Sequence, residues 1–368
     1  MHRIILFFRK EAVLSIALLL ALLSMLVVHP DTAYAGYIGW HTVAMLFCLM
    51  ITVQCFVDAG LFGWIKTKLE HHTRHSRNLA LLLVELVFFC SMLVTNDVSL
   101  IAFVPFTLSV WPREDEKGLR SLVVLETIAA NLGSMLLPVG NPQNLYLYST
   151  YGIPFAPFFL RMLPFSIASL VLLVLLVLLL PFKGAIGPSS ETNEKKLDRR
   201  RLILTTLQFL LCLATVVRIV DWRLTFFLLT ASMVLFSRHL FRKVDYALLL
   251  TFIAFFVFSG NMARIPQLDS YIQGHIEGHA FGFALIASQI ISNVPAAILL
   301  SRFTDAGMGL VYGTNIGGLG TLVASLASLI SFKAYGRSGY SRKAYLATFT
   351  LWNLVFLVVL FAIGKLLV

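Results

Sequence analysis

The stretch "LLPVGNPQNLYLY" at residues 136–148 places two prolines, a glycine, two asparagines and a glutamine inside an otherwise apolar region. Neither proline can donate an amide hydrogen bond, and the Gly140–Asn141 step favours a turn over a continuous helix. The stretch therefore predicts a break that divides one helix into two halves. Asn141, Gln143 and Asn144 then stand as polar side chains at the junction.

The composition indicates a membrane protein. Of 368 residues, 58% are hydrophobic and only 13% are charged. Runs such as "VLSIALLLALLSMLVV" and "ASLVLLVLLVLLLPF" approach the roughly 20 apolar residues that span a bilayer as a helix. We therefore expect an all-α polytopic membrane protein.

In such a protein, a break near the middle of a helix needs a reason. Backbone groups left unpaired in hydrocarbon are costly, so a break persists only where protein, ions or water replace the lost hydrogen bonds. Half-helix ends that meet near the bilayer midplane offer amide donors to anions and carbonyl oxygens to cations. The break at 136–148 therefore predicts a binding site. The alternative is a proline kink that neighbouring side chains fill.

The basic residues give the expected orientation. With the N-terminus inside, 23 of the 29 Lys and Arg residues fall on the inner face, which agrees with the positive-inside rule. The C-terminus then lies outside. The net charge of +11 reports this orientation, and nucleic-acid binding is not expected. The crossings behind this count are 11–29, 37–57, 119–152, 157–182, 202–220, 223–240, 245–262, 309–332 and 344–366.

Two further apolar stretches, 78–110 and 280–304, fit this topology only if they do not cross. We expect each to form a re-entrant helical hairpin that enters and leaves on one face. The tips would be "VTNDVS" (94–99) and "ISNVPA" (291–296), where small and polar residues separate two apolar arms. The first hairpin would open inward and the second outward.

The two halves of the chain align with each other. At an offset of 197 residues the two hairpin segments share an Asn, an Ile, a Phe and a Thr. At an offset of 184, the segment around the break aligns with "NIGGLGTLVASLASLISFKAYG", and the matches include Asn131 with Asn315. Because the charge pattern requires opposite orientations, we expect an inverted repeat. The first repeat spans 1–182, an inner-face linker with a connecting helix spans 183–220, and the second repeat spans 221–368.

The segments "TNDVSLIAFVPFT", "GNPQNLYLY" and "SNVPAAILL" resemble signatures of the ion transporter superfamily. This superfamily includes divalent anion–sodium symporters, citrate transporters and arsenite permeases, and the chain is most similar to short citrate-transporter-like and arsenite-permease-like permeases. The resemblance implies a homodimer with a scaffold domain and a moving transport domain. That domain would hold both hairpins and both broken helices and would carry its cargo by an elevator motion.

The resemblance also implies a binding site. The family's hairpin tips fall on Thr95, Asn96 and Asp97 and on Ser292, Asn293 and Val294, and its helix breaks on 140–144 and 324–328. The expected substrate- and cation-binding residues are Thr95, Asn96, Asp97, Gly140, Asn141, Gln143, Asn144, Ser292, Asn293, Val294, Ser325 and Ser328.

Asp97 and Val294 depart from the family pattern, in which both positions hold a threonine that contacts a carboxylate. An aspartate beside a dicarboxylate would repel it unless a proton or a cation neutralised it. As a carboxylate Asp97 could bind sodium, and as an acid it could carry a proton, since charged groups inside membranes are usually functional. The alternative is that Asp97 only caps the second arm of the hairpin.

Glu126 lies on the approach to the first break and is a second candidate for proton or cation coupling. The alternative is a carboxylate near the inner face that snorkels or pairs with a basic residue. In "HIEGH" (275–279) the alternating His and Glu residues are too few for a metal site without further ligands, so we expect none. We also expect no cofactor other than Na+ or H+ as coupling ion.

The N-terminal segment imitates a signal peptide, because basic and apolar residues precede "AYAG". Its counterpart at 223–240 favours a retained helix.

Three functions remain. The first is a secondary active transporter of a small anion, coupled to sodium ions or protons, in a bacterial-type inner membrane. The second is a sodium/proton antiporter or an arsenite-type efflux permease. The third is an intramembrane enzyme or a passive channel. The enzyme would need a nucleophile–base pair or a metal triad, which the sequence does not show, and a channel would need no alternating hairpins. The expected partners are the anion, the lipid bilayer and a second copy of the chain.

Overall fold

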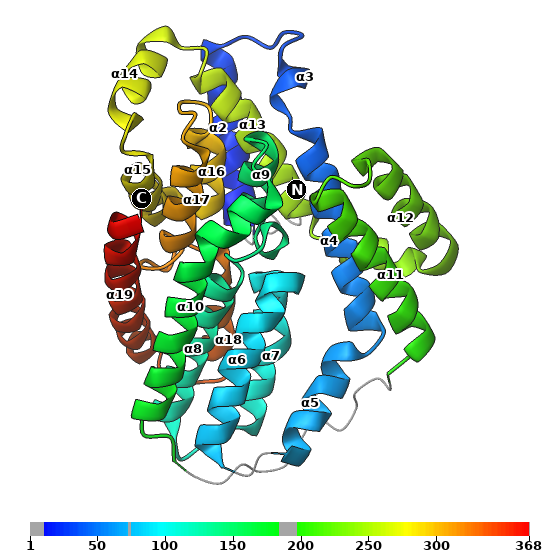
Figure 1. The fold of residues 1–368 in the computed structure, drawn as a ribbon, viewed down its shortest axis with the longest axis vertical. Helices are drawn as coiled ribbons and strands as arrows, with labels where there is room; N and C mark the ends of the chain where they lie inside the picture. Colours follow the sequence, from blue (N-terminus) through cyan, green and yellow to red (C-terminus); the bar gives the residue numbers. More distant parts are fainter. Residues whose placement is uncertain (1–10, 73–74, 184–196, 368) are drawn as a thin grey trace.

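The computed structural model describes residues 11–72, 75–183 and 197–367, and this part of the chain is helical without a β-strand (Figure 1). The apolar runs of the sequence form most of the helices. The elements are α2 (Ala12–Val27), α3 (Tyr34–Tyr37), α4 (Trp40–Asp58), α5 (Leu61–His72), α6 (Ser76–Val94), α7 (Asn96–Val110), α8 (Glu116–Gly133), η1 (Pro138–Gly140), α9 (Pro142–Thr150), α10 (Phe155–Leu179), α11 (Arg199–Val216), α12 (Trp222–Phe236), η2 (Arg238–Lys243), α13 (Tyr246–Met262), α14 (Pro266–Ile276), α15 (Ala280–Ile291), α16 (Asn293–Leu300), α17 (Gly307–Ile316), α18 (Leu326–Arg337) and α19 (Arg342–Leu367).

Several helices are suited to a membrane. Within the described residues, α4, α6, α10 and α19 are long and apolar enough to cross a bilayer, and a fifth span results if α13 and α14, bent by 98°, count as one. The helices α2, α7, α12 and α15 are apolar but shorter. The chain is therefore a multi-pass membrane protein, as its composition predicts.

We divide most of the helices into two groups, which meet where α13 packs against α16 and α4 packs against α9. In the five-helix group, α2 packs against α13, and α4 packs against α11 and α12. In the ten-helix group (α6 to α10 and α15 to α19), α6 packs against α8, α15 against α17, and α18 against both α7 and α8. The predicted broken helices and hairpins therefore all lie in the ten-helix group.

Two glycines allow neighbouring helices of the ten-helix group to pack closely. A β-carbon at Gly133 of α8 would lie 2.1 Å from the Phe88 carbonyl oxygen of α6 and 2.5 Å from Ser91 Oγ. At Gly317, which follows α17, it would lie 2.8 Å from the β-carbon of Ser288 in α15. Both positions therefore need glycine because the neighbouring helix leaves no space.

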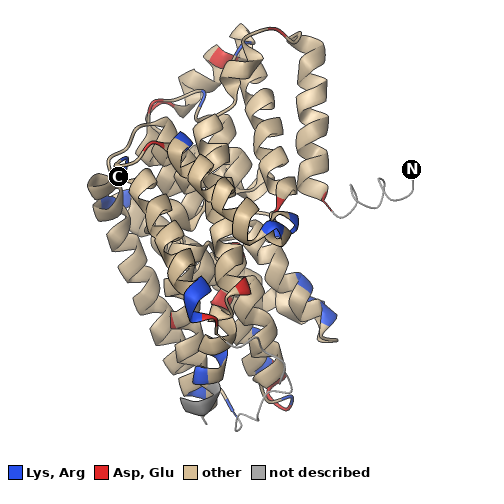
Figure 2. Cartoon of the chain, turned by 90° about the vertical axis from the view of Figure 1, so that its right-hand side faces the viewer, with Lys and Arg blue, Asp and Glu red and all other residues tan. Residues whose placement is uncertain are grey.

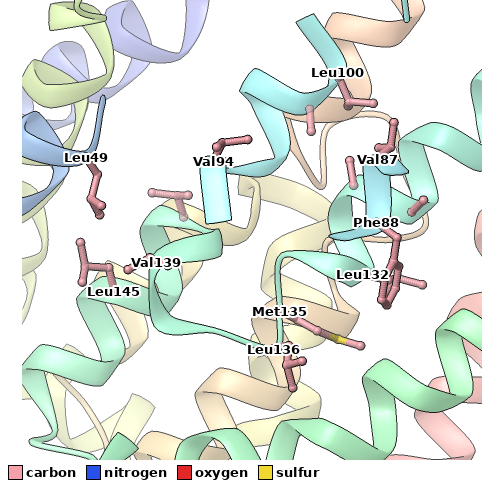
Figure 3. Close-up of a cluster of buried hydrophobic side chains, with 14 of the residues drawn as sticks. Leu49, Val87, Phe88, Val94, Leu100, Leu132, Met135, Leu136, Val139 and Leu145 are labelled. Atoms are coloured by element: carbon pink, nitrogen blue, oxygen red, sulfur yellow. The ribbon is translucent and has the colours of Figure 1, made fainter. Parts of the chain in front are cut away.

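The apolar core continues around these contacts. Figure 3 shows Val87 and Phe88 of α6 beside Leu132 of α8. In the same view Leu49 of α4 lies opposite Val139 and Leu145, so the five-helix group meets the first broken helix through apolar side chains.

Charged residues lie mainly at helix ends and in connecting segments, and the walls of the bundle are largely uncharged (Figure 2). Asp58 at the end of α4 is a buried exception. Its carboxylate lies 2.7 Å from Arg201, 3.4 Å from His239 and 3.9 Å from Lys243.

Candidate functional site

Two one-residue tips end the paired helices where the sequence predicts them. Thr95 separates α6 from α7 with φ 73° and ψ 154°, and Ser292 separates α15 from α16 with φ 75° and ψ 154°. Residues other than glycine rarely adopt this conformation, and it persists only where the surrounding structure enforces it. In Figure 1 the α6–α7 pair lies in the lower half of the molecule and α15–α16 in the upper half.

The predicted break lies between α8 and α9, over residues 134–141, and a second break lies between α17 and α18, over residues 317–325. Pro142 is the first residue of α9, where its missing amide costs no hydrogen bond. Asn141 precedes α9 with φ −142° and ψ 143°, and Ser325 precedes α18 with φ −141° and ψ 136°. Gly140 lies in η1, close to the Ser134 carbonyl oxygen.

Side-chain hydrogen bonds connect the breaks across the two halves of the chain. Asn131 Oδ1 accepts from Asn96 Nδ2 at 3.1 Å and from Ser325 Oγ at 2.9 Å. Asn315 Nδ2 donates to Asn144 Oδ1 at 2.6 Å. All five side chains are buried. The centre of the ten-helix group is therefore a polar cluster inside an apolar bundle.

The residue-by-residue site prediction missed Asn131 and Asn315. The signal was present, because the two asparagines are matched at the offset of 184 that aligns the breaks. Their spacing from the breaks did not reveal that each would bond to a residue of the other half.

The second tip is bonded directly to the second break. The Asn293 amide donates to the Ala324 carbonyl oxygen at 3.0 Å, and Ser292 Oγ donates to the same oxygen at 3.3 Å. Gln289 adds a brace that the sequence did not indicate. Its Nε2 donates to Gly317 at 2.7 Å and to Leu319 at 2.9 Å, so these carbonyl groups are satisfied without a helix.

The first tip borders a cavity of about 200 Å³ between the two helix groups. Thr95, Asp97, Val139 and Pro142 line it from the ten-helix group. Its other wall comes from α4, η2 and α13 and includes Gln54, Lys243 and Asp245. The cavity therefore joins the first tip and the first break to the five-helix group.

Asp97 makes no capping hydrogen bond within the described residues. The residue before α7 is Thr95, and its side chain makes no capping hydrogen bond either. The Asp97 amide donates to Asn96 Oδ1 at 2.9 Å, while Asp97 Oδ1 is buried and has no hydrogen-bond partner among the described residues. The carboxylate thus retains an unused acceptor beside the cavity.

The remaining predicted residues are buried around this centre. Gln143 Nε2 and Ser328 Oγ have no hydrogen-bond partner in the described part of the chain. Asn141 Nδ2 donates to Ser134 Oγ within the first break. Val294 is apolar and buried, so the second tip carries no counterpart of Asp97.

Glu126 lies in α8 and is fully buried. Thr107 Oγ1 donates to Glu126 Oε1 at 2.6 Å, and Glu126 Oε2 has no partner in the described part of the chain. The carboxyl group is therefore not paired with a basic residue near the inner face, which was the alternative to a coupling role.

Comparison with known proteins agrees with this architecture. A family model described as citrate transporter matches residues 4–306. An uncharacterized transporter of Methanocaldococcus jannaschii is 33% identical over 87% of each chain. The inner membrane protein YbiR of Escherichia coli is 31% identical over 84% of each chain.

A silicon efflux transporter of Oryza sativa is 28% identical over 47% of this chain and 36% of its own. These relatives point to a transporter rather than an enzyme, and they confirm the resemblance to the ion transporter superfamily. The chain belongs to the citrate transporter family.

Proposed function

We propose that this protein is a secondary active transporter that moves a small anion, a carboxylate or an oxyanion, with sodium ions or protons. The observation that carries the proposal is the polar cluster where both tips and both breaks approach one another. Asn131 links Asn96 of the first tip to Ser325 of the second break. Such a cluster inside an apolar bundle is expected where a solute or ion replaces lost backbone hydrogen bonds.

The fold behind this site is proposed to be an inverted repeat with two re-entrant hairpins. Support comes from equivalent positions, since Thr95 and Ser292 share one backbone conformation and Asn141 and Ser325 share another. The contact of Gly133 with Ser91 is repeated by Gly317 with Ser288, at the same two offsets that align the sequence. The hairpins lie in opposite halves of the molecule (Figure 1).

Helix ends supply the chemistry for both an anion and a cation. The helices α7, α9, α16 and α18 each begin at a tip or a break, so those amides of their first turns that have no other acceptor offer donors to an anion. The helices α6, α8, α15 and α17 end there, and their last carbonyl groups offer oxygens to a cation. Asp97 would bind the coupling ion, because its free oxygen borders the cavity and its charge would otherwise repel the anion.

Transport would proceed by an elevator motion in a homodimer. The ten-helix group, which contains both hairpins and both breaks, would move, and the five-helix group would remain fixed. Most helix packing lies within a group, and the two groups meet where α13 packs against α16 and α4 packs against α9. We place the protein in a bacterial-type inner membrane, with the N-terminus in the cytoplasm and the C-terminus outside, and the Escherichia coli relative is an inner membrane protein by name.

A second candidate is a sodium/proton antiporter or an arsenite-type efflux permease. Asp97 favours it, because a carboxylate with a free oxygen can exchange a proton for a sodium ion without any anion. The relative named as a silicon efflux transporter agrees with a role in efflux.

Uptake of labelled citrate, succinate, sulfate and arsenite into proteoliposomes tests the leading candidate. Sodium and proton gradients are imposed separately for each solute. We expect one solute to accumulate above its external concentration under one gradient, and Asp97→Asn to abolish this accumulation. The matched control is Asp269→Asn on exposed α14, which should transport normally. Failure of all four solutes to accumulate would contradict the proposal of an anion transporter.

A further inference from the structure

Glu126 is a buried carboxyl group that is not part of the ion-binding site proposed around Asp97. It lies one and a half turns from Asn131, at full burial, with a single hydrogen bond from Thr107. One hydrogen bond does not replace the hydration of a carboxylate, so a charge at this place needs a proton or another cation.

No cation of the protein takes this role in the described part of the chain. Tyr345 of α19 is a titratable group close to Glu126, and Thr107 of α7 donates to its carboxyl group. The charged residues on the helices that pack against α8 form no ion pair with it among the described residues: Arg77 and Glu85 on α6, Asp97 on α7, Arg161 on α10, Lys333 and Arg337 on α18, and Arg342, Lys343 and Lys365 on α19.

A row of buried hydroxyl groups follows one face of the neighbouring helix α18. Ser325, Ser328, Ser331 and Tyr335 are spaced by three, three and four residues, which places them on the same side of the helix. Their relative exposures are 1%, 0%, 0% and 0%. The hydroxyl groups of Ser328, Ser331 and Tyr335 have no hydrogen-bond partner in the described part of the chain. Buried polar groups are normally paired, so three in succession require an explanation.

Tyr345 of α19 connects this row to the Glu126 region. Its hydroxyl group lies 3.5 Å from Thr127 Oγ1, and Thr127 directly follows Glu126 in the sequence. The Ser331 hydroxyl group lies near it without forming a hydrogen bond of standard geometry. The rings of Tyr345 and Tyr335 are 5.0 Å apart between centroids. Glu126, Ser331, Tyr345 and Tyr335 are thus neighbours drawn from three helices.

One end of this row of hydroxyl groups lies at the polar cluster, and the other end lies near the start of α8. At one end, Ser325 donates to Asn131 in the polar cluster. At the other end, Tyr335 lies near Arg120 and Glu116 at the start of α8, where these two side chains are partly exposed, and it forms no standard hydrogen bond with either in the described part of the chain. A hydroxyl group can donate one hydrogen bond and accept another at the same time. A row of hydroxyl groups can therefore transfer a proton from one end to the other, and each group is a hydroxyl again afterwards.

We propose that Glu126 is a proton-binding site and that Ser331, Tyr345 and Tyr335 form a relay between it and Glu116 and Arg120 at the start of α8. Each hydroxyl oxygen accepts one proton and gives up its own to the next acceptor, so one proton moves and no bond is otherwise changed. The inference rests on the proposed function, because it supplies that transporter with a second proton site apart from Asp97.

Infrared difference spectroscopy across a pH titration tests the site without any need for transport. The purified full chain in liposomes should show the carbonyl stretch of a protonated carboxylic acid. Glu126→Gln should remove this band, and Asp97→Asn should leave it. Thr107→Val, which keeps the side-chain shape and removes the hydrogen bond to Glu126, should shift its frequency. A spectrum that is the same in Glu126→Gln and Thr107→Val as in the wild type would overturn the site.

A pH jump followed at the same band tests the relay. Tyr345→Phe and Tyr335→Phe should slow proton equilibration by tenfold or more. Tyr312→Phe, which alters a buried tyrosine of α17 away from the relay, should leave the rate unchanged. Equal rates in all four proteins would overturn the relay. Labelled-anion uptake by the same liposomes separates the two proposals, since a Glu126 band without uptake supports the site and contradicts anion transport, whereas uptake without the band overturns only the site.

Discussion

Asn131 accepts a hydrogen bond of 2.9 Å from Ser325, a residue 194 positions further along the chain. The same oxygen accepts from Asn96 at the first tip. Asn315, the equivalent residue of the second half, donates to Asn144 of the first break. Each half of the chain therefore fixes a helix break of the other half, and the polar cluster exists only when both halves are folded together.

Asn131→Ala should damage both stability and transport. The substitution removes the acceptor shared by Asn96 and Ser325 and leaves two buried donors unpaired, at a cost of about 1–3 kcal/mol each. We expect a lower melting temperature in detergent and at least a tenfold loss of transport. The matched control is Asn353→Ala, because Asn353 is also buried and, within the described residues, donates only to Phe349 of its own helix. Equal effects of the two substitutions would remove the special role of Asn131.

Glycine should be tolerated or stabilising at both tips. Thr95 and Ser292 adopt φ near +75°, a region where a side chain costs roughly 1–3 kcal/mol. Thr95→Gly and Ser292→Gly should therefore keep or raise the melting temperature, whereas Ser292→Val should lower it. Thermal unfolding of the purified variants decides this, and a lower melting temperature for both glycine variants would argue against the tip conformation.

Replacing the glycines at the close helix contacts by alanine should destabilise the fold. Gly133→Ala and Gly317→Ala would each place a methyl group within 3 Å of a neighbouring backbone or side-chain atom. We expect both to lose folded yield in fluorescence-detected size-exclusion chromatography, since overpacking costs about 1–3 kcal/mol. Gly282→Ala, where no atom lies within 4 Å of the added carbon, is the control and should retain the wild-type yield. Unchanged yield in all three would contradict the packing.

The buried carboxylate of Asp58 should be needed for stability. Asp58→Asn would leave Arg201 and Lys243 close together without their counter-charge. Removing one partner of a fully buried pair costs about 3–5 kcal/mol, and the cost here should be smaller because the cations are half-exposed. The matched substitution is Asp31→Asn, which breaks a surface pair with Arg264 and should cost less than about 1 kcal/mol. A smaller loss of melting temperature for Asp58→Asn than for Asp31→Asn would contradict this account.

The sequence predicts the helix breaks well because they have local causes. Pro142, Gly140 and the polar residues of the tips can be recognised from a few neighbouring residues alone. In the structure, both tips lie inside the predicted segments, and the first break spans residues 134–141. The predicted hairpin arms agree with α6, α7, α15 and α16 to within a few residues. The short helices α5 and α14 were not predicted, because charged and polar residues interrupt their apolar pattern.

The partners of the site residues could not be predicted from the sequence. Periodicity says which face of a helix is apolar, but it does not say which helix will meet that face. Asn131, Asn315 and Gln289 act through residues at least 28 positions away in sequence, so their roles appear only in the folded chain. The same holds for Asp97, whose sequence allows a cap, whereas the structure leaves its Oδ1 unpaired beside the cavity.

The most direct test of the central claim uses proteoliposomes that contain a pH-sensitive dye. A sodium gradient is imposed first, and citrate, succinate, sulfate and arsenite are then added in turn, with Asp97→Asn in parallel. An anion symporter predicts a change of internal pH, or accumulation of labelled solute, only with one particular anion and only when Asp97 is intact. Proton movement driven by sodium alone, lost in Asp97→Asn, would contradict anion symport and establish the antiporter instead.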